Sequence, residues 1–286
     1  MALVAAGVTV VLWASAFVGI RAVGADFSPG PLTLGRLVVG AIVLGGVVAF
    51  DGLVLPRGRE LLFMVIYGLL WFAGYNIALN AAEKSLDAGT AAMLVQIAPV
   101  IVAILAGVFL KEGFPPRSLV GSVVALCGAV IIAAGSGSDR RIELTGVLVC
   151  LLAGILYAAG MVAQKPVLRT TPALQATWLG CTVGVLACLP FTPTLWTEIG
   201  AASTGSILGL VYLGVFPTAV AFTTWAYALS RTPAGQLGAT TYLVPVVAAA
   251  MSWVLLDEVP PALSFVGGAL CLVGVALTRL RPRRSP

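Results

Sequence analysis

The sequence predicts an all-α integral membrane protein of ten transmembrane helices, arranged as two inverted five-helix repeats around a central cavity. Of the 286 residues, 60% are hydrophobic and 9% are charged, whereas a soluble domain is typically about 25% charged. The charged residues are gathered between long apolar runs, which is typical of a polytopic helical membrane protein. Short segments of alternating polarity, which a membrane β-barrel needs, are absent from the sequence.

The apolar runs define the expected membrane spans. A helix needs about 20 mostly apolar residues to cross the hydrocarbon core of a bilayer. The segments between the runs are short and contain most of the prolines and charges, so no soluble domain is expected. The ten runs that meet the length requirement are 3–24, 31–50, 60–82, 88–110, 117–135, 144–165, 172–191, 203–228, 235–256 and 262–280.

An internal repeat relates the two halves of the chain. A shift of 146 positions, without a gap, superimposes proline, glutamate and glycine residues that are poor random choices in or beside a membrane helix. We therefore expect two repeats, residues 1–140 and 141–286, with five spans each. Because each repeat has an odd number of spans, the second repeat crosses the membrane in the opposite orientation to the first. Inverted repeats of this kind are found in transporters, whose substrate site lies near the midplane of the bilayer. The matched pairs are Gly89 and Gly235, Pro99 and Pro245, Glu112 and Glu258, Pro115 and Pro261, Gly121 and Gly267, and Gly128 and Gly274.

The distribution of Lys and Arg predicts the orientation. If the N-terminus is cytoplasmic, 11 of the 16 basic residues lie on the cytoplasmic side, among them the tail residues Arg281, Arg283 and Arg284. The outer side then has Arg21, Lys84, Arg140 and Arg141, with Arg36 just inside the second span, and it also has most of the acidic residues. By the positive-inside rule, both termini are expected in the cytoplasm and the protein in the cell inner membrane.

The composition also excludes several kinds of site. The chain has no histidine, which removes histidine proton relays, histidine metal sites and His-activated nucleophiles. The five cysteines lie in apolar runs without a CxxC spacing and are interpreted as packing residues. We therefore expect no metal, no cofactor and no enzymatic activity. The basic pI of 9.1 comes from loop and tail arginines and indicates topology rather than nucleic-acid binding.

Four sequence stretches resemble a known family. The stretch WASAFVGIRA in the first span, PLTLGRLVVGAIVL in the second, APVIVAILAGVFLKEGFPPRSLVGSVVALCGAVII across the fourth and fifth, and the second copy of that pattern at 245–274 are similar to the EamA-type ten-span exporters of the drug/metabolite transporter superfamily. The resemblance implies a secondary transporter that exports small metabolites by alternating access, with aromatic or neutral amino acids as the expected substrates. The second half departs from the family pattern, because its seventh span has no arginine matching Arg36, and Lys165 stands where the first half has Arg21.

Three prolines are expected to bend their helices. Pro99 and Pro245 lie about midway along the fourth and ninth spans, and Pro217 lies in the eighth. A proline inside a helix leaves the carbonyl four residues earlier without its donor, here the carbonyls of Val95 and Thr241 for the first two. Since such a group is costly in lipid, we expect both bends to line the cavity, where a free carbonyl would accept a substrate ammonium; the alternative is that they only shape packing.

Polar and aromatic residues near the middle of the spans are candidates for substrate binding. Gln96 and Tyr242 are equivalent in the repeat and lie one turn before the prolines. A buried polar side chain in a membrane needs a partner, and here the expected partner is substrate or water. Aromatic residues far from the span ends favour a cavity wall over an interfacial belt. The candidate substrate-binding residues are Trp13, Ser15, Trp71, Tyr75, Asn76, Asn80, Gln96, Tyr157 and Tyr242.

Arg36 is the one charge well inside a predicted span. An intramembrane base is a functional candidate by default. A structural role, such as donating to backbone carbonyls between helices, is the favoured interpretation, and binding of a substrate carboxylate is the alternative. Glu112 and Glu258 are interpreted as structural or gate charges at the start of the following helices.

Three other functions are alternatives to amino-acid export, and each makes a demand on the sequence. A carrier of anionic metabolites such as sugar phosphates would need Arg36, Arg21 and Lys165 to point into the cavity. A non-transporting scaffold would not need pseudo-symmetric halves. A membrane enzyme would need paired intramembrane acids, histidine or metal-ligand spacing, and these are absent from the sequence. Because one chain supplies both halves, a monomer is expected, with a small-molecule substrate and the lipid bilayer as its partners.

Overall fold

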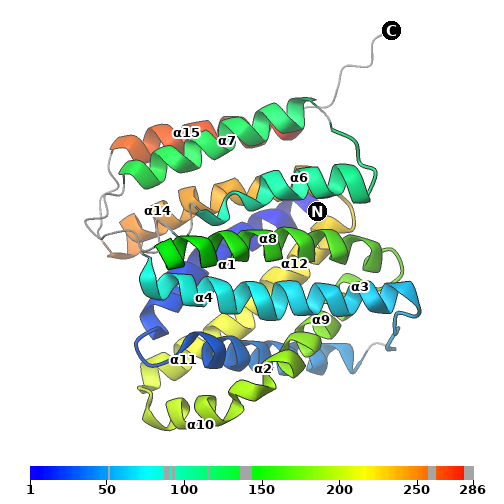
Figure 1. Cartoon of the computed structure of the whole chain (residues 1–286), viewed down its shortest axis with the longest axis vertical. Coiled ribbons are helices and arrows are strands. Elements are labelled where there is room, and N and C mark those ends of the chain that lie inside the picture. The colour runs from blue at the N-terminus through cyan, green and yellow to red at the C-terminus, as the bar shows by residue number, and fades with distance from the viewer. Residues whose placement is uncertain are drawn as a thin grey trace.

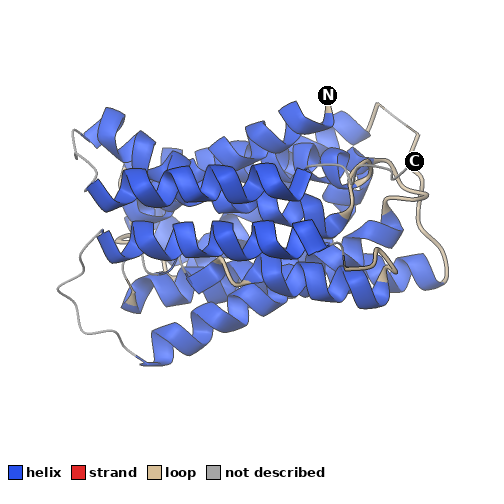
Figure 2. Ribbon diagram, turned by 90° about the horizontal axis from the view of Figure 1, so that it is seen from above, coloured by secondary structure: helices blue, strands red, loops and turns tan. Residues whose placement is uncertain are grey.

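A computed structural model describes residues 1–50, 52–86, 91, 94–114, 116–135, 144–256 and 262–279. The described residues form a bundle of helices without a strand (Figures 1 and 2). Several features expected from the sequence lie outside the described residues, namely Gly89, Arg140, Arg141, Glu258, Pro115, Pro261, the tail arginines 281, 283 and 284, and the boundary between the expected repeats at 140/141.

Within the described ranges, six stretches of helix are long and apolar enough to cross a membrane, namely Ala2–Val23, Pro29–Val48, Arg59–Ser85, Leu144–Val167, Ala173–Ala201 and Thr204–Leu229. Shorter apolar helical stretches span Ala98–Phe109, Leu119–Gly128 and Val266–Leu277. Many large apolar side chains on the outer faces are exposed, for example Ile42 at 69% and Leu208 at 64%. A soluble monomer rarely exposes so much contiguous apolar surface, so the chain has the character of an integral membrane protein.

The first half begins with two uninterrupted helices, α1 (Ala2–Val23) and α2 (Pro29–Val48). The next helical stretch changes its winding in the middle, from α3 (Arg59–Tyr67) through the π-helical segment η1 (Gly68–Tyr75) to α4 (Asn76–Ser85). Helix α6 (Ala98–Phe109) follows a turn at residues 96–97, and α7 (Pro116–Gly135) ends the half.

The second half follows a similar path. It consists of α8 (Leu144–Val167), α9 (Ala173–Cys188), α11 (Thr204–Leu213), the π-helical segment η3 (Gly214–Val220), α12 (Ala221–Leu229), α14 (Leu243–Leu256) and α15 (Ala262–Arg279). Two short pieces, α13 (Ala234–Gly238) and the 3-10 turn η4 (Ala239–Tyr242), precede α14.

One stretch expected to be a loop is helical. After α9, a 3-10 turn η2 (Leu189–Phe191) leads into α10 (Thr192–Ala201), which packs against α2. Pro193 lies in the first turn of α10. Proline is tolerated there because the N–H groups of the first turn have no acceptor within the helix. Trp196 on this helix is 79% exposed, as expected for an aromatic side chain at a membrane interface.

Helices α7 and α15 lie side by side at one edge of the bundle (Figure 1). They meet through glycines, because a Cβ at Gly128 would lie 2.5 Å from the carbonyl oxygen of Gly267, and a Cβ at Gly274 would lie 2.6 Å from that of Gly121. The earlier glycine of each helix contacts the later glycine of the other, so the two helices run antiparallel. Small residues that let backbones approach closely are typical of helix contacts in membranes.

The loops fall into two sets at opposite ends of the bundle. At one end, Glu198 accepts from Ser28, and Lys84 donates to the carbonyls of Gly24 and Phe27. At the other end, Gln175 bonds to residues 52 and 54, Glu112 accepts from the backbone N–H groups of Ala234 and Gly235, and Lys165 donates to the carbonyls of Leu229 and Thr232. We call the first set the Arg21 end and the second the Lys165 end.

Candidate functional site

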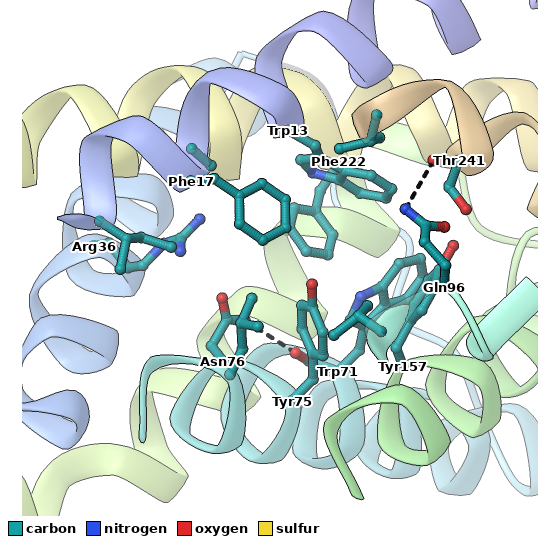
Figure 3. Close-up of a pocket in the computed structure, with 15 residues that line it drawn as sticks. Trp13, Phe17, Arg36, Trp71, Tyr75, Asn76, Gln96, Tyr157, Phe222 and Thr241 are labelled. Atoms are coloured by element: carbon teal, nitrogen blue, oxygen red, sulfur yellow. Dashed lines mark hydrogen bonds between the residues drawn. The ribbon is translucent and has the colours of Figure 1, made fainter. Parts of the chain in front are cut away.

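A cavity lies at the centre of the bundle, between α1, α2, η1, α4, α8, α12 and the breaks before α6 and α14. Figure 3 shows Arg36 on one side of this cavity and Gln96 with Thr241 on the other, with aromatic rings between them. Most of the lining is apolar. The lining residues are Trp13, Ala16, Phe17, Ile20, Arg36, Trp71, Tyr75, Asn76, Leu79, Val95, Gln96, Tyr157, Phe222, Thr241 and Val244.

The π-helical segment η1 brings two of the predicted aromatic residues to the cavity. Trp71 and Tyr75 both lie in η1 and both line the cavity. Asn76 stabilises this winding, because its Nδ2 donates to the carbonyl of Trp71 at 3.0 Å and to that of Phe72 at 2.9 Å. Short π-helical insertions in α-helices are often found at functional sites.

Aromatic rings close the Lys165 side of the cavity. Trp13 of α1 lies with its ring centroid 6.0 Å from Trp71, 6.3 Å from Tyr157 and 5.5 Å from Phe222. Trp225 lies 4.9 Å from Trp13 and is fully buried. Edge-on and tilted ring pairs at these distances are favourable, so the rings form a packed layer rather than a loose lining.

The helix breaks before α6 and α14 correct the expectation of simple proline kinks. Pro99 and Pro245 lie near the N-terminal ends of α6 and α14, each directly after a turn, and not in the middle of a continuous helix. Proline is well tolerated at the start of a helix because its missing N–H lacks an intrahelical partner there. The Thr241 carbonyl, which lies four residues before Pro245, accepts from Gln96 Nε2 at 3.3 Å (Figure 3).

Pro217 has a different effect from a simple kink, since it lies inside the π-helical segment η3. In α-helical winding its missing N–H would leave the carbonyl of Leu213 without a donor. In η3 the Thr218 hydroxyl donates to that carbonyl at 2.8 Å. Arg36 Nε then donates to the same hydroxyl oxygen at 3.1 Å. The winding around Pro217 therefore positions Arg36, which is 4% exposed and lines the cavity.

A second hollow, which we call the vestibule, adjoins the cavity at Ile20, a residue that lines both. Its remaining lining comes from the Arg21 end of α1, α2 and α4 and includes three charged residues, Arg21, Glu83 and Lys84. Asn80 lies here rather than in the central cavity, and its Nδ2 donates to the hydroxyl of Thr33 at 2.9 Å. The vestibule is thus the neighbour of the cavity on the side of the Arg21 end.

Besides Asn80, two predicted site residues do not line the cavity. The Ser15 hydroxyl bonds to the carbonyl of Leu12 at 2.8 Å and to the Tyr212 hydroxyl at 2.7 Å, so it faces α11. Tyr242 packs with Ala125 of α7 and Cys271 of α15. The 3-10 winding of η4, with three residues per turn, directs Tyr242 away from the cavity and leaves the preceding residue, Thr241, on the lining.

Sequence reasoning missed several residues of the site, chiefly Phe17, Phe222 and Glu83. Phe17 follows Trp13 by one helical turn, so its place on the same face could have been read from the spacing. Glu83 follows Asn76 by two helical turns, but it lies just beyond the end of the predicted span 60–82 and was therefore interpreted as an acidic residue outside the membrane. In the described part of the chain, no group of three His, Cys, Asp or Glu is arranged to hold a metal ion.

Comparison with known proteins shows what this chain is similar to. A "Probable terminal-alkyne amino-acid exporter" of Streptantibioticus cattleyicolor is 37% identical over 274 residues, which cover 96% of this chain and 91% of the relative. An "Uncharacterized transporter YdfC" of Bacillus subtilis is 34% identical over 94% of this chain and 88% of its own length. A "Probable amino-acid metabolite efflux pump" of Escherichia coli K12 is 25% identical over 73% of each chain.

The fold also has a counterpart among solved structures. A crystal structure with 21% sequence identity superimposes with a TM-score of 0.80 and covers 97% of this chain and 96% of its own. At that identity the likeness concerns the fold. The EamA-like transporter family matches the chain twice, over residues 1–134 and 144–280. The chain therefore belongs to the EamA-like transporter family of the drug/metabolite transporter superfamily and is a small-molecule exporter of that type.

Proposed function

We propose that this protein exports aromatic or other neutral amino acids from the cytoplasm by alternating access. The observation that carries the proposal is the central cavity, whose aromatic walls are flanked by one buried base, Arg36, on one side and by the Gln96 amide and Thr241 carbonyl on the other. Aromatic and apolar walls with a few fixed polar groups are typical of small-molecule sites. A zwitterion with an apolar side chain fits this distribution of groups.

The relatives support the same substrate class. Two of the three relatives described above are named as exporters or efflux pumps of amino acids or their metabolites, and one of these is 37% identical over nearly the whole chain. Those names belong to the relatives, and the cavity residues of this chain supply the independent argument. A neutral amino acid is therefore the substrate that both arguments favour.

Alternating access follows from the proposed architecture of ten spans in two inverted repeats, 1–140 and 141–286. The helix contacts support it, because the first helix of each half packs against helices of the other half. Helix α1 packs against α12 and α14, and α8 packs against η1, α4 and α6. The π-helical segments begin at Gly68 and Gly214, which are 146 positions apart, the same shift that the sequence repeat predicts. The antiparallel glycine contacts of α7 and α15 add further support.

In this proposal the structure corresponds to the outward-facing pose. The vestibule opens at the Arg21 end, which the charge distribution predicts to be extracellular. At the other side, the rings of Trp71, Phe222 and Trp225 are at most 2% exposed, which supports a closed path there. With one chain supplying both halves, the transporter works as a monomer in the cell inner membrane, with both termini in the cytoplasm.

Efflux from proteoliposomes tests the proposal. Vesicles containing the full chain are preloaded with radiolabelled aromatic, aliphatic and hydroxyl amino acids or with a sugar phosphate, with and without a pH gradient. Saturable efflux of amino acids is expected, and the gradient arm tells coupled from facilitated transport. Absence of amino-acid efflux in both arms would refute the proposal.

One observation favours a second candidate, a carrier of anionic metabolites. Arg36 lines the cavity and Arg21 lines the vestibule, so two of the three bases that this function would need face the path. The third, Lys165, does not, because its ammonium is bound to the carbonyls of Leu229 and Thr232. Efflux of the sugar phosphate without amino-acid efflux is the result that would favour this candidate.

A further inference from the structure

Glu83 is a half-buried acid in the vestibule, and the transport path described above gives it no role. It lies on α4, and its Oε1 atom is buried without a hydrogen-bond partner. A buried polar atom without a partner costs free energy, and most such atoms in proteins have one. Glu83 is also the one acidic residue that lines either the cavity or the vestibule in the described part of the chain. The unpartnered oxygen therefore indicates a ligand that supplies a donor.

The charges around Glu83 leave that oxygen free. Arg36 of α2 and Arg21 of α1 are near enough for their charges to act on Glu83, yet neither donates to its Oε1. The neighbouring ammonium of Lys84 is bound to the carbonyls of Gly24 and Phe27. The other titratable groups that face Glu83 are the neutral side chains Tyr75 of η1 and Cys150 of α8.

Arg36 has spare hydrogen-bonding capacity on the same path. Its described hydrogen bond runs from Nε to the Thr218 hydroxyl, which leaves Nη1 and Nη2 for another acceptor. The planar guanidinium binds carboxylates well, with two parallel hydrogen bonds where the geometry allows. Arg36 lines the cavity and Glu83 lines the vestibule, and the two compartments meet at Ile20.

We propose that Arg36 and Glu83 form a recognition site for a zwitterion where the cavity joins the vestibule. Arg36 binds the α-carboxylate of the substrate, Glu83 binds its α-ammonium, and the aromatic cavity takes the side chain. The inference rests on the proposed function and adds to it the groups that recognise the amino-acid backbone. A monoanion would leave the Glu83 carboxylate unpaired and a monocation would leave Arg36 unpaired, whereas a zwitterion satisfies both.

Three ligands that share the same phenyl group separate the contributions of Arg36 and Glu83. Phenylalanine has both charged groups, 3-phenyllactate replaces the ammonium by a hydroxyl, and phenethylamine lacks the carboxylate. Binding to the purified full chain is followed through tryptophan fluorescence, since Trp13 and Trp71 line the cavity. Because each preference is a ratio of affinities within one variant, it does not depend on the fraction of protein that is folded.

The wild-type protein is expected to prefer phenylalanine over both analogues. Glu83→Gln should reduce the preference over phenyllactate by about 10- to 100-fold, the worth of a hydrogen bond to a charged group, and Glu83→Asp should restore part of it. Arg36→Gln should reduce the preference over phenethylamine instead. Glu60→Gln is the matched control, because Glu60 begins the same long helix at its opposite end and lines neither compartment.

The outcomes separate this inference from the proposed function. If the wild-type protein binds phenyllactate as well as phenylalanine, or if Glu83→Gln leaves the phenylalanine preference unchanged, the recognition site is refuted while amino-acid export can stand. A Glu83→Gln variant that keeps the preference but loses stimulation by a pH gradient would assign the carboxylate to proton transfer and would overturn the inference. Failure of the wild-type protein to bind or export any amino acid would refute the proposed function as well.

Discussion

The two π-helical segments have equivalent places in the two halves but contribute different chemistry to the cavity. Segment η1 begins at Gly68 and η3 at Gly214, 146 positions apart. In the first, Trp71 and the following turn supply the aromatic wall. In the second, the position equivalent to Trp71 is Pro217, and its neighbour Thr218 holds Arg36 through its hydroxyl.

This difference explains how a repeated scaffold makes an asymmetric site. The winding of the backbone is shared by both halves, whereas the side chains at equivalent positions have diverged. One half contributes aromatic rings to the cavity, and the other supports the buried base. In the proposed function, this difference gives the ligand a defined orientation, with its charged end toward Arg36.

Removing the aromatic wall should give the largest effect. Trp71→Ala deletes a ring that lines the cavity and contacts Trp13 and Tyr157. Loss of a large buried side chain costs about 3–5 kcal/mol of stability, and we expect a fall in affinity for aromatic amino acids of at least about tenfold, since a stacked ring contributes up to ~1.5 kcal/mol beyond its buried area. Thermal unfolding and fluorescence titration measure the two effects.

The matched control for this variant is Trp225→Ala. Trp225 is as buried as Trp71 and contacts Trp13 at 4.9 Å, but it does not line the cavity. Its removal should lower the melting temperature by a similar amount while the folded fraction keeps its affinity. Equal losses of affinity in both variants would mean that η1 has no special part in binding.

Breaking the support of Arg36 should have the next largest effect. Thr218→Val keeps the side-chain shape but removes the hydroxyl that donates to the Leu213 carbonyl and accepts from Arg36. Each buried group left without a partner costs about 1–3 kcal/mol, so we expect lower stability together with weaker binding of the substrate carboxylate. Thr218→Ser keeps the hydroxyl and should behave nearly as wild type in both assays; an equally severe Ser variant would contradict this account.

Sequence patterns predicted the cavity residues that lie far from the ends of their membrane spans. Trp13, Trp71, Tyr75 and Tyr157 lie far from helix ends, where interfacial placement is disfavoured, and all of them line the cavity. Arg36 was found because a base inside an apolar run is rare. In these cases the residue type and its place along the span were sufficient to predict that the side chain lines the cavity.

The prediction failed at the 3-10 turn before α14 and where a local partner satisfies the side chain. The 3-10 winding of η4 exchanges Tyr242 for Thr241, which no count of 3.6 residues per turn anticipates. Ser15 is satisfied by Leu12 and Tyr212, and the second contact depends on tertiary packing. Pro99 and Pro245 indicated that the helices are interrupted, but they did not indicate that a new helix begins at each proline.

Changes at Gln96 and Tyr242, which are equivalent in the repeat, compare the two helix breaks and should have smaller effects than the variants above. Gln96→Leu removes the donor to the Thr241 carbonyl, and we expect a loss of about 1–3 kcal/mol in stability with a clear fall in transport rate. Tyr242→Phe, at the equivalent position, should have almost no effect, since the Tyr242 hydroxyl has no hydrogen-bond partner in the described structure and does not line the cavity. Similar effects of the two changes on efflux would show that the breaks are functionally equivalent.

The loop contacts at the two ends should give the smallest effect. At the Arg21 end, Asp26 accepts from the backbone N–H and hydroxyl of Ser203 at 3.1 and 3.2 Å, whereas at the opposite end the acid, Glu60, lies on a helix and accepts from the loop residue Thr170 at 2.7 Å. Hydrogen bonding from the Ser206 hydroxyl, and then from Ser203, lowers the pKa of Asp26 below its usual value of 3.8.

Because the folded protein holds this carboxylate in its charged form, the contribution to stability is present above pH 3.8 and is lost as the pH falls through the lower folded-state pKa. Asp26→Asn should therefore lower the melting temperature slightly at neutral pH and have no effect on it at the acid end, while Glu60→Gln serves as the comparison at the other face. The difference should be small, because Asp26 is open to solvent, which screens its interactions. A difference between Asp26→Asn and wild type that grew on acidification would mean that the carboxylate destabilises the fold, contrary to the hydrogen bonds that it accepts at the Arg21 end.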